Sequence, residues 1–97
     1  MFGVRVEITY ASQEVRAMSV RIYIGGLSFN ITDDSLRDAF NNYGEIVDAI
    51  IIRERETGLS RGFGFVTFSD DVSAQSAIDD LDGSEYEGRT ITISRSR

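Results

Sequence analysis

Two halves with the same plan are the feature that most constrains how this chain can fold. Each half has a strand-like segment, a helix-like segment and a second strand-like segment. The helix-like segments run from a cap at Thr32 to a stop at Gly44, and from a start near Ser69 or Asp70 to a stop at Gly83. Their apolar residues recur at i, i+3, i+4 and i+7, which predicts one buried stripe per helix. The stripes consist of Leu36, Ala39, Phe40, Tyr43, Ala74, Ala77, Ile78 and Leu81.

The strand-like segments are residues 21–24, 46–52, 62–68 and 89–95, which alternate in polarity or are rich in β-branched and aromatic residues. A helix with a single apolar stripe must bury it, so both helices are expected on the same side of one sheet. We therefore predict an α+β fold of the ferredoxin-like βαββαβ kind, with a four-stranded antiparallel sheet and two helices packed on one face. The other face is left open.

Alternation of side chains assigns residues to the open face. In the segment SRGFGFVTF, residues 60–68, Val66 and Phe68 suit the helix side, so Arg61, Phe63 and Phe65 point the other way. The same argument on the first strand turns Tyr23 outward. Three rings on one face are compatible with a second apolar layer or a dimer interface. The glycines at 62 and 64 and the nearby arginine favour instead a flat ligand that carries a phosphate.

Composition limits the chemistry that the chain can perform. The 97 residues form one domain, and they include no cysteine and no histidine, which removes thiolate and imidazole chemistry. We expect no catalytic residue, no metal and no cofactor. The net charge of −6 argues against indiscriminate polyanion binding. Yet residues 21–29, 57–68 and 89–97 together hold five arginines and no acid, whereas residues 69–83 hold five aspartates and no base. The acid is thus expected mainly behind the sheet.

Two short motifs carry a resemblance to a known family. RGFGFVTF, residues 61–68, matches the octamer of the RNA recognition motif, and IYIGGL, residues 22–27, resembles its companion hexamer. The chain resembles this family from about residue 19 to 94, and is most similar to glycine-rich RNA-binding proteins and heterogeneous nuclear ribonucleoproteins. The resemblance implies that Tyr23 and Phe65 stack on successive bases, that Phe63 packs against a sugar, and that Arg61 contacts the phosphate backbone.

The resemblance also implies a function and a ligand. It implies single-stranded RNA binding in post-transcriptional RNA processing or RNA chaperoning, in the nucleus or the cytoplasm, with single-stranded DNA as a further candidate ligand. We expect an intracellular monomer without a membrane span. Glycine-rich relatives often carry a lysine where Ile50 stands, so an apolar residue replaces a polar contact there. Ile50 either offers an apolar surface to a base, extends a protein contact patch, or reflects drift without a role. The secondary binding residues that we expect are Ile50, Ile52, Thr92, Arg95 and Arg97.

Two other functions are compatible with the same fold. A protein-binding variant would use the sheet or the acidic helix of residues 69–83 to hold a partner; such variants usually lose the exposed rings, which this chain keeps. An acylphosphatase-like enzyme would need an anion-binding loop with an arginine after the first strand. GGLSFNIT, residues 25–32, has no arginine.

The two ends lie outside the predicted domain of residues 19–94. Residues 2–10 alternate cleanly, which indicates either an added strand or sequence upstream of an ordinary domain start at Met18. Residues 95–97 begin a C-terminal tail, in which Arg95 and Arg97 either follow RNA as it leaves the sheet or lie in a solvated terminus.

Overall fold

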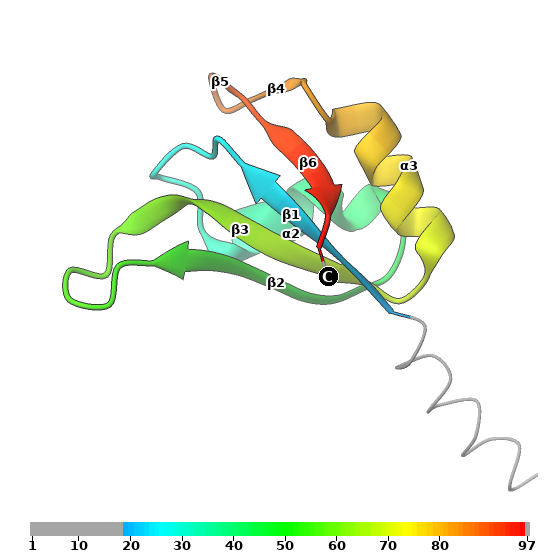
Figure 1. The fold of residues 1–97 in the computed structure, drawn as a ribbon, viewed down its shortest axis with the longest axis horizontal. Helices are drawn as coiled ribbons and strands as arrows, with labels where there is room; N and C mark the ends of the chain where they lie inside the picture. The colour runs from blue at the N-terminus through cyan, green and yellow to red at the C-terminus, as the bar shows by residue number, and fades with distance from the viewer. Residues whose placement is uncertain (1–18, 97) are drawn as a thin grey trace, which may run out of the picture.

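The computed structural model describes residues 19–96, and the alternating segment 2–10 and Arg97 lie outside them. Figure 1 shows the elements in chain order. They are β1 (Val20–Gly25), α2 (Asp33–Phe40), the 3-10 turn η1 (Asn41–Tyr43), β2 (Ile46–Arg53), β3 (Ser60–Phe68), α3 (Asp71–Leu81), β4 (Glu85–Tyr86), β5 (Arg89–Thr90) and β6 (Thr92–Arg95).

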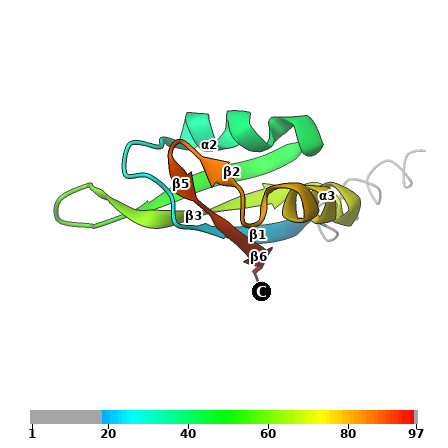
Figure 2. The same ribbon diagram turned by 90° about the horizontal axis from the view of Figure 1, so that it is seen from above.

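Four of these strands form one antiparallel sheet in the order β2-β3-β1-β6. Helix α2 packs along β2, and α3 packs against β1, β3 and β6, as the second view shows (Figure 2). The predicted fold class is confirmed. The two central strands, β1 and β3, are the ones that carry the two motifs, so both motifs lie side by side in the middle of the sheet.

The core lies between the sheet and the two helices. Strand residues at alternate positions, such as Ile22 and Ile24 on β1 and Val66 and Phe68 on β3, are fully buried. The helices meet them with the stripes expected from the sequence, although only part of each stripe is fully enclosed. Leu36, Phe40, Ala74 and Ala77 are buried, while Ala39, Tyr43, Ile78 and Leu81 pack partly buried at the margin. The remaining side chains of β1 and β3 point to the other face of the sheet, so they are not needed to fill the core.

The helix ends follow the predicted signals. The Thr32 hydroxyl accepts a hydrogen bond from the Ser35 N–H, and the Asp70 carboxylate accepts one from the Ser73 N–H, so each helix has a side-chain N-cap. The Asp33 carboxylate accepts a hydrogen bond from the Ile51 N–H and ties the start of α2 to β2. The helix ends three residues earlier than the apolar spacing suggests, because the last turn tightens into η1.

The C-terminal segment differs from the prediction. Residues 89–95 were expected as one strand, but Arg89 and Thr90 pair back with Glu85 and Tyr86 in a two-stranded hairpin, and only β6 joins the main sheet. The turn of this hairpin has positive φ at both central residues, 51° at Glu87 and 83° at Gly88. That is the turn geometry whose twist suits a two-residue hairpin. Glutamate is uncommon at the first central position of such a turn. The hairpin was therefore not recognised, and the alternation of residues 89–95 predicted a single strand.

Candidate functional site

Three aromatic rings lie together on the open face of the sheet. We call Tyr23, Phe63 and Phe65 the ring shelf. Their ring centroids are 5.7 Å apart for Tyr23 and Phe63, 6.0 Å for Tyr23 and Phe65, and 6.1 Å for Phe63 and Phe65. Tyr23 and Phe65 are direct cross-strand partners. All three are half-buried, so the rings support one another and keep surface exposed to a ligand.

Gly25 allows the Tyr23 ring to lie against the sheet. Gly25 has the same outward orientation as Tyr23, and a methyl group at that position would lie 2.5 Å from the Tyr23 hydroxyl and 2.9 Å from its Cε2. A side chain there would push the ring away from the strand. The strand-like segment predicted from the sequence ends at Ile24, one residue before Gly25. The shared parity of Gly25 and Tyr23 is the signal that indicates this role.

Arg21 is a site residue that the sequence reasoning did not name. Its guanidinium carbon lies 5.3 Å from the centroid of the Phe65 ring, within the range of a cation–π contact. Arg21 shares the outward parity of Tyr23 and lies two residues before it on β1, so alternation contained the signal. The ring shelf therefore has a positive charge at the end opposite to Arg61.

The glycines of β3 have a different role from the one expected. Gly64 does not keep space above the rings, because a methyl group at that position would lie 2.5 Å from the carbonyl oxygen of Ile50 on the neighbouring strand. It permits a close approach of β3 to β2. Gly62 has a φ of 86°, which a residue with a side chain rarely adopts, and its place next to Arg61 marks an irregularity in the β2–β3 pairing.

Most of the secondary residues border the ring shelf. Ile50 is 42% exposed and pairs directly with Phe65, and Ile52 follows it on the same side of β2. Thr92 pairs with Gly25 and is exposed. Arg61 is exposed at the end of the shelf that lies near the β2–β3 loop. The structure thus brings the three rings together, places Arg61 two residues before Phe63 on β3, and adds an apolar margin at Ile50.

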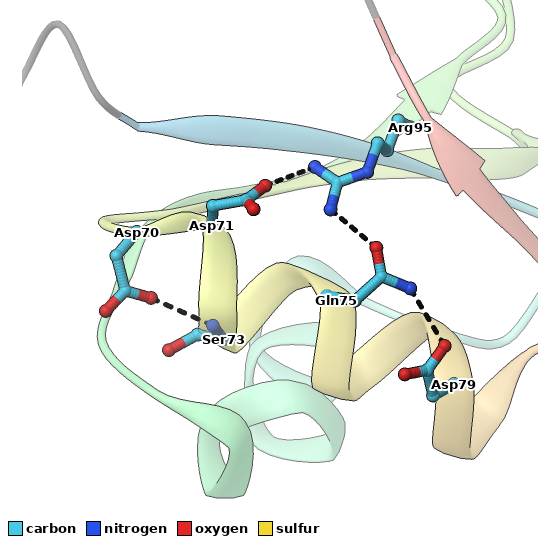
Figure 3. A network of polar contacts seen from close by, with 6 residues as sticks. All are labelled: Asp70, Asp71, Ser73, Gln75, Asp79 and Arg95. Atoms are coloured by element: carbon cyan, nitrogen blue, oxygen red, sulfur yellow. Dashed lines mark hydrogen bonds and ion pairs between the residues drawn. The ribbon is translucent and has the colours of Figure 1, made fainter.

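Arg95 lies elsewhere. It continues the parity of Ile91 and Ile93, which are buried toward the helices, and its guanidinium donates hydrogen bonds to Asp71 and to Gln75 of α3, each at 2.6 Å (Figure 3). The Gln75 amide in turn donates to Asp79. This network joins the end of β6 to α3, so the structure does not bring Arg95 together with the ring shelf. Arg97 lies outside the described residues.

The polar contacts of α3 confirm that acid gathers on the helix side of the molecule. The hydrogen bonds from Ser73 hold the pKa of the Asp70 carboxyl below its ordinary value, because they favour the charged form. Asp80 accepts a hydrogen bond from the Tyr43 hydroxyl, and this bond raises the pKa of Tyr43. The Asp82 carboxylate accepts the Ile93 N–H at 2.8 Å. These carboxylates are therefore engaged away from the ring shelf.

Two features that would indicate a different kind of function are absent from residues 19–96. These residues contain no group of three acidic, cysteine or histidine side chains placed to hold a metal ion. No helix in this part of the chain is long and apolar enough to cross a membrane. The ring shelf and its arginines remain as the arrangement with evident binding chemistry.

Comparisons with known proteins identify a family model and curated proteins that are similar to this chain. A family model described as the RNA recognition motif matches residues 22–92. Glycine-rich RNA-binding protein 2, mitochondrial, of Arabidopsis thaliana is 50% identical over 88 residues, which cover 91% of this chain and 56% of that protein. Glycine-rich RNA-binding protein 1 of Mycosarcoma maydis is 50% identical over 76 residues, which cover 78% of this chain and 43% of that protein. The chain thus spans about half the length of these relatives.

Solved structures match the fold as well. The crystal structure of RNA binding protein PG1 superimposes with a TM-score of 0.78 at 36% identity, and the match covers 79% of this chain and 93% of that one. The structure of the RNA15 RRM gives a TM-score of 0.76 at 26% identity, covering 81% of this chain and 91% of that one.

Proposed function

This chain belongs to the RNA recognition motif family, and from that membership we propose that it binds single-stranded RNA on the ring shelf. The similarity to glycine-rich RNA-binding proteins, expected from the two motifs, is confirmed. The chain is a member of a family of non-catalytic binding modules and is not an enzyme.

The arrangement of the rings supports a stacking mechanism. Tyr23 and Phe65 each offer one ring to a base, and Phe63, next to both, packs against the sugar between them. Stacking of a base on an aromatic side chain contributes about 1–3 kcal/mol, and it requires bases that can leave their neighbours. Single strands satisfy this condition and a rigid duplex does not. Because every base has a stacking face, single-stranded DNA is a second candidate ligand.

The arginines complement the rings. Arg61 is proposed to contact the phosphate backbone at one end of the shelf, and Arg21 to supply positive charge beside Phe65 at the other. Ile50 extends the apolar surface next to Phe65, and Ile52 and Thr92 complete the margin. Within residues 19–96, Arg21 and Arg61 are the cations that we place beside the shelf, so we expect binding that depends more on stacking than on phosphate neutralisation.

The proposed biological role is post-transcriptional RNA processing or RNA chaperoning inside the cell. Relatives named as mitochondrial make the mitochondrion a third compartment to examine, beside the nucleus and the cytoplasm. Three further expectations stay predictions. They are partner binding through the acidic helix of residues 69–83, the monomeric state, and the division of the chain at residues 18 and 94.

The observation that carries the proposal is the cluster of three half-buried rings on a face that no described element covers. Phe65→Ala is expected to weaken binding of a short single-stranded RNA by about 1–3 kcal/mol, because it removes one stacking surface. Isothermal titration calorimetry measures the change. Val72→Ala, which truncates a 74% exposed side chain on α3, is the matched control. Equal affinity of the two variants, both folded, would contradict the stacking role of Phe65.

A further inference from the structure

The sheet has two outer strands, β2 and β6, and an aspartate lies against the outer edge of each. Figure 1 shows both strands at the margins of the sheet, and among residues 19–96 no further strand pairs with their outer sides. The Asp33 carboxylate accepts the Ile51 N–H of β2, and the Asp82 carboxylate accepts the Ile93 N–H of β6, each at 2.8 Å. An edge strand presents N–H and C=O groups to which another chain can add a strand. Each aspartate therefore occupies a donor that an added strand would need.

The edge of β6 is also closed by backbone contacts. The Ile91 N–H donates to the Ser84 carbonyl at 2.9 Å, and the Ile91 carbonyl accepts the Gly83 N–H at 2.8 Å. These bonds hold the chain that follows α3 beside the start of β6, which has only four residues. Loss of the Asp82 carboxylate would thus free one N–H on a short strand whose start stays covered.

The edge of β2 depends instead on side chains of α2, the helix that packs along this strand (Figure 2). The Arg37 guanidinium donates to the Ile46 carbonyl at 3.3 Å, and Asp33 holds the Ile51 N–H. Ile46 is the first residue of β2, so the Arg37 bond covers only the start of the strand. Asp33 is the contact further along, and its loss would open the longer part of this edge.

The sequence of β2 suits pairing with another strand. Its eight residues, IVDAIIIR, include five β-branched residues, one acid and one arginine, and no glycine or proline. Such segments associate when their edge is exposed. The pairing of β2 with β3 is irregular between Ile46 and Asp48 and between Ile51 and Arg53. The regular stretch available to an added strand is therefore residues 48–51.

This regular stretch is complementary to a second copy of itself. The Ile51 N–H points away from β3, and the backbone groups of Ala49 point the same way because backbone direction repeats every two residues. An antiparallel pair about a two-fold axis joins the Ile51 N–H of one copy to the Ala49 carbonyl of the other, and the reverse. That register places Ile50 opposite its own copy and Asp48 opposite Ile52, so no like charges meet.

We propose that the outer edge of β2 is a strand-pairing surface for a second copy of this chain, and that Asp33 keeps the surface closed. While the Asp33 carboxylate holds the Ile51 N–H, an incoming strand has to displace a charge-assisted hydrogen bond. Without the carboxylate the N–H loses its partner, and pairing with a second copy satisfies it. The surface is independent of the proposed RNA binding, because it uses backbone groups of β2 and not the ring shelf.

Sedimentation equilibrium of the full chain tests this proposal. The wild type is expected to be a monomer, and Asp33→Ala is expected to form a dimer of about twice that mass at the same concentration. Asp33→Asn keeps an oxygen that accepts the Ile51 N–H, so it is expected to stay monomeric. Asp82→Ala is the matched control. It also removes a bond from a carboxylate to an edge N–H, but Gly83 and Ser84 keep the edge of β6 closed, so we expect a monomer.

A second substitution tests the register. Ile50→Lys, added to Asp33→Ala, places two lysines opposite each other at the two-fold axis and is expected to restore the monomer. In the Asp33→Ala dimer, amide hydrogen exchange at Ile51 is expected to slow as protein concentration rises, because strand pairing removes this N–H from solvent.

Each alternative result would contradict a defined part of the proposal. A folded Asp33→Ala protein that stays monomeric would overturn it, and so would a wild type whose Ile51 amide is already protected by dimer formation. A dimer that survives Ile50→Lys would exclude the β2 edge. Equal dimerisation of Asp82→Ala would show that loss of stability, and not the open edge, causes association. Circular dichroism verifies folding, and Asp33→Ser, with a side chain one bond shorter than aspartate, replaces Asp33→Ala if that variant does not fold.

Discussion

At the scale of single residues, the open face of the sheet depends on two glycines as well as on the three aromatic rings. Tyr23 can lie along β1 because Gly25 has no side chain, and β3 can approach β2 because Gly64 has none. Both glycines lie within the two family motifs of the sequence. A methyl group at Gly25 would meet the tip of the Tyr23 side chain, whereas one at Gly64 would meet the backbone carbonyl of Ile50.

This difference leads to a prediction for Gly25→Ala. The new methyl group would displace the Tyr23 ring from the strand, so we expect weaker RNA binding, by up to about 1–3 kcal/mol, with little change in stability. Calorimetric titration and thermal unfolding of the same sample measure the two quantities. Gly64→Ala is the contrasting variant, because its methyl group would meet the Ile50 carbonyl and reduce the stability of the sheet. Affinity of Gly25→Ala equal to that of the wild type would exclude this role of Gly25.

Residue-level alternation predicted the orientation of each primary site residue and contained further signals that were not used. Arg21 has the parity of Tyr23, and Arg95 has the parity of the buried Ile91 and Ile93. Alternation does not state what a side chain touches. That Arg21 lies over Phe65, and that Arg95 meets Asp71, depends on strands and a helix that are far apart in the chain.

At the scale of elements, the two helices and three of the four sheet strands follow their local signals closely. The caps at Thr32 and Asp70 and the apolar spacing in α2 and α3 are short-range properties, so they were readable in advance. The exception is the segment before β6, where the turn at Glu87 and Gly88 diverts Arg89 and Thr90 into a separate hairpin. The Tyr86 hydroxyl donates to the Ser35 carbonyl of α2 and fastens that hairpin to the other half of the fold.

The N-cap of α3 predicts a dependence of stability on pH. The Ser73 hydrogen bonds lower the pKa of the folded Asp70 carboxyl, so its contribution to stability is present above the unfolded value and is lost as pH falls through the folded value. Asp70→Asn keeps a capping oxygen but does not titrate. We expect the thermal midpoint of the wild type to fall more than that of Asp70→Asn as pH falls through the acidic range. Parallel curves for the two proteins would show that Asp70 contributes no such dependence.

At the scale of the whole molecule, the carboxylates in and next to α3 lie apart from the arginines of the ring shelf. The carboxylates of α3 lie on the helix side and are engaged with Ser73, Tyr43, Ile93 and Arg95, while Arg21 and Arg61 flank the ring shelf. Exposed charges more than about 8 Å apart are largely screened at physiological salt. A chain with a net charge of −6 can therefore present a locally positive binding face.

This separation predicts a weak dependence of RNA affinity on salt. With two arginines beside the shelf, we expect a slope of log K against log salt no steeper than about −1.4, because each phosphate contact to a single strand contributes about −0.7. Arg61→Ala is expected to reduce the slope by about 0.7. Arg95→Ala is the control, because Arg95 is bound to α3. A slope unchanged by Arg61→Ala but reduced by Arg95→Ala would reverse the assignment of the phosphate contact.

The sequence by itself determined the fold class, the two faces of the sheet and the identity of the three rings on the open face. These features arise from residues close in the chain, where the periods of strands and helices are visible as spacing. The tertiary structure alone decided which distant residues meet: the Phe29 loop with the Leu59 loop, Arg95 with Asp71, and Tyr23 with Phe65 at a defined distance. The physical reason is that a contact between segments depends on strand order and register, which local spacing does not encode.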